Sequence, residues 1–171
     1  MKTDKLVAAG LMICMITVTT MFFKIPIPFA HGYVHAGDAM IFMAVLMLGI
    51  KCGVVCAALG SAMGDVLGGF ALWAPWTLVI KGAMALIMGL FIFFMAKKIA
   101  GRIIGMIAAG IWMTAGYFVA EGIIYGNWVV AMIGIPWNVG QFAVGMAIAT
   151  ALSGALYRTP ARKHFAFQSD Q

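Results

Sequence analysis

The sequence predicts an all-α integral membrane protein with six transmembrane helices, and three observations support this fold class. Of its 171 residues, 64% are hydrophobic and only 9% are charged, whereas soluble domains average about 25% charged residues. Apolar runs long enough for helical spans follow one another along most of the chain. The 21 glycines suit helices that pack closely in lipid, where small residues are enriched at interfaces. We therefore expect one membrane-embedded domain over residues 1–171.

The first half of the chain is expected to hold three spans. Residues 6–23 form the first apolar run, and no clean small-x-small cleavage site closes it, so we interpret it as a retained span and not as a signal peptide. Residues 24–37 contain two prolines and two histidines, which favours an ordered loop. The other expected elements of this half are a shorter span that Asp38 N-caps and that ends at Ile50, a tight connection at 51–53, and a third span over about 54–69.

The second half is expected to hold three further spans, separated by a loop rich in Trp and Pro, a basic turn and a polar-aromatic loop. The polar tail from Arg158 onward is expected to fray. In chain order these elements are the loop 70–76, the span 77–96, the basic turn with Lys97, Lys98 and Arg102, the span 103–125, the loop 126–136 and the span 137–157.

The basic residues are distributed very unevenly across this topology. One side holds only Lys24. The other side holds Lys2, Lys5, Lys51, Lys97, Lys98, Arg102, Arg158, Arg162 and Lys163. Because basic loops remain in the cytoplasm, both termini are expected there. The net charge of +6 is thereby explained by topology in a multi-pass protein of the cell membrane, and no nucleic-acid partner is needed.

Two charged residues flank the loop 70–76. Asp65 precedes it and Lys81 follows it, each about 7 Å inside the expected hairpin at ~1.5 Å per residue. A charge at a helix centre in lipid costs about 2.5–3.5 kcal/mol on insertion scales. We therefore expect Asp65 and Lys81 to form a structural ion pair.

Most remaining polar groups fall in the outer half of the expected bundle, which favours a ligand pocket open to the outside over a continuous channel. Glu121 is the strongest candidate because no basic residue lies at helical spacing from it. An interfacial belt is an equally good interpretation of any one tryptophan, and Asp38 also serves as a helix cap. The expected substrate-binding residues are His35, Asp38, Trp73, Trp76, Glu121, Tyr125, Trp137, Asn138 and Gln141.

No motif supplies energy or a metal. The phosphate-binding pattern G-x-x-x-x-G-K-[ST] is absent, so the chain cannot hydrolyse ATP by that route. Cys52 and Cys56 are four residues apart but have no further ligands nearby, which argues against a metal site. Neither a cofactor nor a metal is expected.

Two segments carry a resemblance to a known family: GYVHAGDAMIFMAVLMLG, from Gly32, and GSAMGDVLGGFALWAPWTLVIKG, from Gly60. They resemble the substrate-binding S-components of energy-coupling factor (ECF) vitamin transporters, in the riboflavin-type branch. The resemblance implies six helices, an outward pocket, a vitamin or precursor as substrate, and as partners a transmembrane coupling subunit and two cytoplasmic ATPase subunits that use the ATP. It also implies a small-residue docking face on the first span. The nearest equivalents here are Ala8, Ala9, Gly10 and Cys14, of which Gly10 and Cys14 hold the four-residue spacing.

Three alternatives remain open from the sequence. The pocket residues favour hydroxymethylpyrimidine or a pyridoxine-type ring, with riboflavin next, and pantothenate is disfavoured because the one intramembrane base is assigned to Asp65. A second class is an intramembrane enzyme whose site is made by His31, His35, Asp38 and Glu121, although the metalloprotease pattern H-E-x-x-H is absent. A third is an assembly subunit that binds no ligand.

Overall fold

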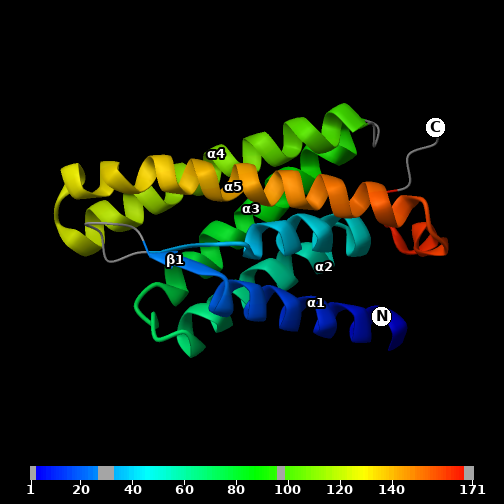
Figure 1. Ribbon diagram of the computed structural model, residues 1–171, viewed down its shortest axis with the longest axis horizontal. Coiled ribbons are helices and arrows are strands. Elements are labelled where there is room, and N and C mark those ends of the chain that lie inside the picture. The colour runs from blue at the N-terminus through cyan, green and yellow to red at the C-terminus, as the bar shows by residue number, and fades with distance from the viewer. Residues whose placement is uncertain (1–2, 27–32, 96–98, 168–171) are drawn as a thin grey trace.

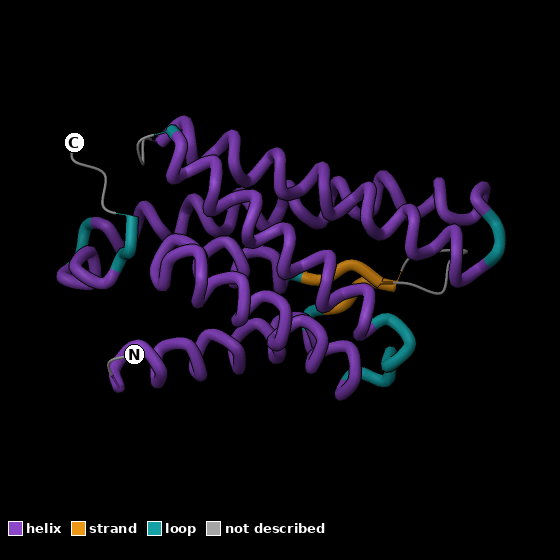
Figure 2. The backbone as a smooth tube through the Cα atoms, turned by 180° about the vertical axis from the view of Figure 1, so that it is seen from behind, coloured by secondary structure: helices purple, strands orange, loops and turns teal. Residues whose placement is uncertain are grey.

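A computed structural model describes residues 3–26, 33–95 and 99–167. Five long helices run along the long axis of the molecule (Figures 1 and 2), and within the described residues these five are long and apolar enough to cross a membrane. They are α1 (Thr3–Phe22), α2 (Gly37–Leu67), α3 (Ala74–Phe94), α4 (Ile99–Tyr125) and α5 (Trp128–Tyr157). The all-helical membrane fold is therefore confirmed.

The helix α2 contains a reversal at Gly49, whose φ of 81° and ψ of 179° are not helical. A Cβ added to Gly53 would lie 2.9 Å from Val45 Cα, although these residues would be roughly 12 Å apart along a straight helix. The chain thus folds back on itself at Gly49, where a residue with a Cβ would be strained. The predicted connection at Lys51–Gly53 is wrong, since those residues are helical. The part of α2 before Gly49 is roughly 18 Å long, less than the ~30 Å hydrocarbon thickness.

Two predicted loops are shorter than expected. Asn127 caps α5, because its Oδ1 accepts from the N–H groups of Val129 (2.9 Å) and Val130 (3.3 Å), and most of the predicted loop 126–136 is helical. Pro136 lies inside α5, which membrane helices tolerate. Similarly α3 begins within the predicted loop 70–76, with Pro75 in its first turn, where the missing N–H breaks no helical bond.

The segment between α1 and α2 includes two short antiparallel strands, β1 (Lys24–Pro26) and β2 (Tyr33–His35), with Lys24 opposite His35. The N-cap position of α2 is Ala36, without a side-chain cap. The predicted capping role of Asp38 is therefore wrong, and its carboxylate is buried inside the bundle.

The tail after Arg158 packs against the bundle, contrary to the prediction that it frays. It includes the short 3₁₀ helix η1 (Pro160–His164), followed by Phe165 and Phe167, which are buried. The N–H of Ala166 donates to the carbonyls of Leu46 (3.0 Å) and Met47 (3.1 Å), close to the reversal in α2. Lys97 and Lys98 of the predicted basic turn lie outside the described residues.

The two ends of the bundle differ in what they contain. The β1–β2 strands, the α2–α3 turn and the α4–α5 turn lie at one end, which we call the hairpin end (Figures 1 and 2). The start of α1 and η1 lie at the other, which we call the terminal end. Between them α2 occupies a central position, with α1, α3 and α5 packed around it.

Candidate functional site

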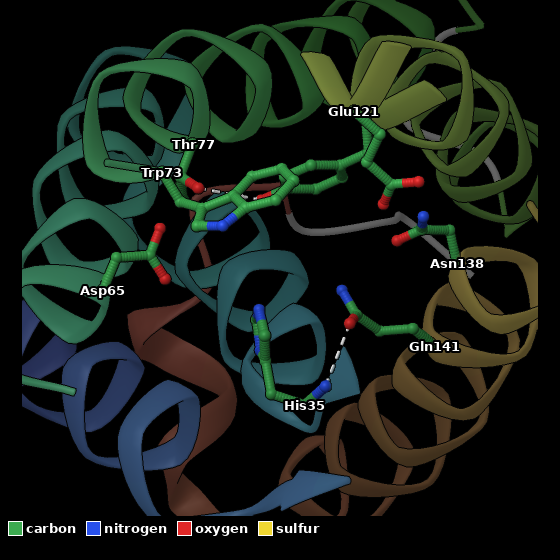
Figure 3. A pocket seen from close by; sticks show the side chains of 8 residues that line it. His35, Asp65, Trp73, Thr77, Glu121, Asn138 and Gln141 are labelled. Carbon is green, nitrogen blue, oxygen red and sulfur yellow. Dashed lines mark hydrogen bonds between the residues drawn. The ribbon is translucent and has the colours of Figure 1, made fainter. Parts of the chain in front are cut away.

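A pocket opens at the hairpin end of the bundle (Figure 3). Its empty volume, including the open mouth, is about 390 Å³. The lining comes from β2, α2, the start of α3, α4 and α5, so elements distant in sequence build one site. The lining residues are His35, Asp65, Trp73, Thr77, Tyr117, Glu121, Asn138 and Gln141.

An aromatic cluster forms one wall of this pocket. Trp73 precedes α3, and its ring lies 6.3 Å from that of Tyr117 and 5.9 Å from that of Tyr125, edge-on to the latter. The hydroxyls of Thr77 and Tyr117 are 3.1 Å apart and share a hydrogen bond. These contacts hold the rings in fixed orientations, which provides a flat apolar surface for a planar ligand.

The acidic side of the pocket is formed by Glu121 on α4. Its Oε2 is buried and has no hydrogen-bond partner among the described residues. A Cβ added to Gly134 would overlap this carboxylate, so the glycine on α5 provides the space that Glu121 occupies. Asn138 lies beside it (Figure 3) and donates from Nδ2 to the Gly134 carbonyl at 3.1 Å. A buried carboxylate oxygen without a donor is suited to accept from a ligand.

The floor of the pocket is set by His35 and Gln141. The His35 N–H donates to Gln141 Oε1 (2.9 Å), which ties β2 to α5 (Figure 3). The Gly37 N–H donates to His35 Nδ1 (3.0 Å), so the neutral imidazole carries its proton on Nε2. A Cβ on Gly37 would lie 2.7 Å from His35 Nδ1, and only glycine allows this close approach.

The buried lysine pairs with a different carboxylate from the one predicted. Lys81 forms its ion pair with Asp38, and both side chains are fully buried, so the predicted Asp65–Lys81 pair is wrong. Lys81 Nζ also donates to Met113 Sδ (2.8 Å), and Gln141 Nε2 donates to Asp38 Oδ2 (3.0 Å). Equal depth in one hairpin suggested the wrong partner, because Lys81 faces the part of α2 before Gly49. Asp65, after Gly49, lines the pocket instead.

Of the predicted binding residues, five line the pocket: His35, Trp73, Glu121, Asn138 and Gln141. Tyr125 packs edge-on against the Trp73 ring, and Asp38 accepts a hydrogen bond from Gln141. Trp76 and Trp137 are half-buried and do not line the pocket, and His31 lies outside the described residues.

Sequence reasoning missed Thr77 and Tyr117. Tyr117 lies four residues before Glu121, and Thr77 lies four after Trp73, so each shares a helix face with a predicted binding residue. That spacing was the available signal.

The four expected docking residues on α1 have different environments. Gly10 and Cys14 are exposed, and an added Cβ at Gly10 would have no atom of the described chain within 4 Å. Ala8 is half-buried. Ala9 packs against the core, and its carbonyl accepts from Cys56 Sγ at 3.5 Å.

Metal binding has no support in the geometry. Over residues 3–26, 33–95 and 99–167, no three His, Cys, Asp or Glu side chains are grouped so that they could hold a metal ion.

Three comparisons relate this chain to known proteins. Residues 1–158 match the family model described as ECF-type riboflavin transporter, S component. A Pyrococcus woesei protein, named "Uncharacterized protein in gap 3'region", is 40% identical over 112 residues, which cover 65% of this chain and 74% of that relative. A solved structure described as "Structure and mechanism of the S component of a bacterial ECF transporter" superposes with a TM-score of 0.71 at 20% identity, covering 92% of this chain and 98% of the other, and thus has the same fold.

Proposed function

The chain belongs to the family of ECF-type riboflavin transporter S components, and from this premise we propose that it captures a small heteroaromatic vitamin or vitamin precursor of the hydroxymethylpyrimidine or pyridoxine type. S components are non-enzymatic, multi-pass membrane subunits that bind the substrate of a vitamin transporter and work with the subunits of an ECF transport module. The substrate, its binding residues and the details of assembly are the proposed part.

The observation that carries the proposal is the buried Oε2 of Glu121, which has no donor among the described residues. An exocyclic amine or a ring N–H of the ligand would satisfy it, and a charge-assisted bond of this kind is among the stronger ones. Trp73, across the pocket, offers a face on which the ring stacks.

Charge argues against an anionic substrate. Among the described side chains that line the pocket there is no lysine or arginine, and Lys81 is committed to Asp38. A carboxylate-bearing ligand such as pantothenate would be repelled by the Glu121 carboxylate, whose buried Oε2 has no hydrogen-bond partner among the described residues.

The test is a titration of purified protein with hydroxymethylpyrimidine, pyridoxine, riboflavin and pantothenate, followed by tryptophan fluorescence. We expect the first two to bind most tightly. Glu121→Gln should weaken binding of the preferred ligand by more than about 1.5 kcal/mol, or more than about tenfold, because a charged hydrogen bond is lost. The control is Asp4→Asn, which neutralises an exposed carboxylate on α1. Tight pantothenate binding, or an indifferent Glu121→Gln variant, would overturn the assignment.

The remaining parts of the proposal concern topology and assembly. We propose six membrane-embedded segments, with the two parts of α2 counted separately, and cytoplasmic termini, as the basic residues favour. The pocket then opens to the outside, no cofactor is bound, and ATP is hydrolysed by two partner ATPase subunits. A reporter fused after Gln171 should be cytoplasmic. In a variant whose three native cysteines have been replaced, Leu72→Cys in the α2–α3 turn should react with a thiol reagent added from outside. The opposite labelling would reject this topology.

Docking to the coupling subunit is proposed for the exposed face of α1 at Gly10 and Cys14. Gly10→Trp adds bulk at a position where no atom of the described residues lies within 4 Å of an added Cβ. It should abolish uptake and complex formation while ligand binding is retained. An equal loss of ligand binding would show that this face belongs to the internal fold.

A further inference from the structure

The buried residues Lys81, Asp38 and Gln141 form a chain of hydrogen bonds that ends at the backbone of β2. Lys81 on α3 donates to Asp38 Oδ1, and Gln141 Nε2 on α5 donates to Asp38 Oδ2 at 3.0 Å. The other end of the same amide, Gln141 Oε1, accepts from the His35 N–H at 2.9 Å. Three helices and one strand are therefore joined through a single side-chain amide.

The direction of each bond in this chain is determined by charge. A carboxylate paired with a lysine can only accept, so Asp38 requires the NH₂ end of the Gln141 amide. The carbonyl end must then point the other way, toward β2, where the His35 N–H is a donor. Were the amide reversed, its NH₂ would face the N–H of His35 and two donors would oppose each other.

We propose that Asp38 is a positioning residue, which, through the orientation of the Gln141 amide, fixes the β2 end of the β1–β2 hairpin against the pocket and so keeps the site preformed. This inference rests on the proposed function for the meaning of the pocket, but the hydrogen-bond chain is independent of which ligand binds. Asp38 does not line the pocket, and it acts on the ligand only through Gln141 and His35.

The packing of α2 against α5 supports this role, because a glycine on α5 allows the two helices to approach closely beside Asp38. A Cβ on Gly145 of α5 would lie 2.8 Å from Asp38 Cβ and 3.1 Å from Ala39 N. Gly145 lies one helical turn after Gln141, so the close approach that it allows brings Asp38 within reach of that amide. Met113 on α4 completes the enclosure, with its sulfur 2.8 Å from Lys81 Nζ and 3.5 Å from Gln141 Nε2.

The decisive variants exchange donors and acceptors in this hydrogen-bond chain while keeping side chains of nearly the same shape. In Asp38→Asn, the new carbonyl accepts from Lys81 and the new NH₂ faces Gln141. The Gln141 amide must turn over to accept from it, and the His35 N–H loses Gln141 Oε1 as its acceptor. In the double variant Asp38→Asn with Gln141→Glu, the new carboxylate at position 141 accepts both from the amide at position 38 and from the His35 N–H. The hydrogen-bond chain is thus restored, with the negative charge at position 141 instead of position 38.

The measurement is amide hydrogen exchange at His35 in the ligand-free protein. The chain has three histidines, so selective ¹⁵N-histidine labelling gives few signals, which His164→Gln helps to assign. We expect Asp38→Asn to accelerate exchange of the His35 amide at least about fivefold, the factor for loss of one ordinary hydrogen bond. The double variant should return it toward the wild-type rate, and ligand affinity should follow the same order.

Two further variants keep the proposal falsifiable if Asp38→Asn does not fold. Gln141→Met is close in shape and leaves the Asp38–Lys81 pair intact, yet it should expose the His35 amide to the same extent. The matched control is Gly140→Ala on the same helix, because no atom of the described residues lies within 4 Å of an added Cβ there. It should leave exchange unchanged.

An unchanged His35 amide in Gln141→Met, or a double variant no better than Asp38→Asn, overturns the positioning role. If exchange behaves as expected but no vitamin binds any variant, the proposed function fails while this inference stands.

Discussion

The two ends of the bundle each bury a cation, and they stabilise it in different ways. At the hairpin end, Lys81 is completely buried and is neutralised by Asp38. At the terminal end, Arg102 is 9% exposed, and its Nη2 donates to two neutral acceptors, the Tyr157 hydroxyl and the Phe167 carbonyl, each at 2.8 Å. Its guanidinium also lies 4.9 Å from the centre of the Tyr157 ring.

This difference indicates that the Lys81–Asp38 contact is permanent, whereas the contact of Arg102 with the C-terminal segment can be released. Separating Lys81 from Asp38 would leave each of two buried charges without its counter-ion, which is very unfavourable in a dry site. Separating Arg102 from the C-terminal segment would leave one cation at the edge of the bundle and two neutral acceptors, which water can satisfy. We infer that the hairpin end is rigid and the terminal attachment is weaker.

The largest effect is expected from breaking the buried pair. Among the described residues, Lys81→Met leaves the Asp38 carboxylate with the Gln141 amide as its remaining side-chain donor. The free energy of unfolding should therefore fall by about 3–5 kcal/mol. Lys81→Met combined with Asp38→Asn should be milder than Lys81→Met alone, because no unpaired charge remains. Denaturant unfolding in detergent measures both. Lys51→Met, at an exposed position, is the control and should have little effect.

The same experiment sharpens the assignment of the partner. If Asp65 were energetically coupled to Lys81, Lys81→Met would lower the free energy of unfolding less in an Asp65→Asn background than in the wild-type protein. We expect these two substitutions to be additive within about 0.5 kcal/mol, as for residues that share no contact. Strong coupling between them would contradict the ion pair described above.

The choice of partner also shows how far the sequence could lead. Hydropathy predicted α1, α3 and α4 to within a few residues, because a helix in lipid must satisfy its own backbone and so produces a continuous apolar run. The glycines were a weaker guide to the position of the reversal. It lies at Gly49, and nothing in the local sequence distinguishes this glycine from the others in α2. Only the tertiary fold reveals that the short segment before Gly49 carries Asp38 toward Lys81.

The pocket residues, too, could be predicted only where the local sequence made them conspicuous. Glu121 and Gln141 were found because polar residues are costly in lipid and therefore conspicuous. Tyr117 and Thr77 were not, because a threonine hydroxyl can bond to the carbonyl one turn earlier in its own helix, and tyrosine is common near the membrane surface. The packed tail was missed because Phe165 and Phe167 occur in a polar, basic segment, where two aromatics give no periodic pattern.

A smaller effect is expected from crowding the contact that supports the buried pair. Gly145→Ala places a methyl group 2.8 Å from Asp38 Cβ, so α2 and α5 must separate at this point. Overpacking of this kind costs about 1–3 kcal/mol. Ligand affinity should also fall, because Asp38 moves away from Gln141. Thermal unfolding and titration measure the two effects.

The control for that substitution is on the same helix. Gly140→Ala adds its methyl group in open space and replaces glycine by the best helix former, so stability should be unchanged or raised by up to about 1 kcal/mol. If both alanine variants behave alike, close packing at Gly145 does not matter for the site.

The smallest effect is expected at the terminal end, from Tyr157→Phe. The hydroxyl accepts from Arg102 and donates to the Phe167 carbonyl at 2.8 Å, and its loss should cost about 1 kcal/mol because Arg102 still reaches that carbonyl directly. The ring stays, with its centre 4.3 Å from that of Phe165, so the segment is loosened and not removed. Limited proteolysis should cut the segment after Arg158 faster, while ligand affinity stays at the wild-type value. Thr19→Val, which removes a hydroxyl bonded only within α1, should change neither measurement. A loss of ligand affinity in Tyr157→Phe as large as in Gly145→Ala would mean that the two ends are energetically coupled and that the terminal attachment is part of the binding site's support.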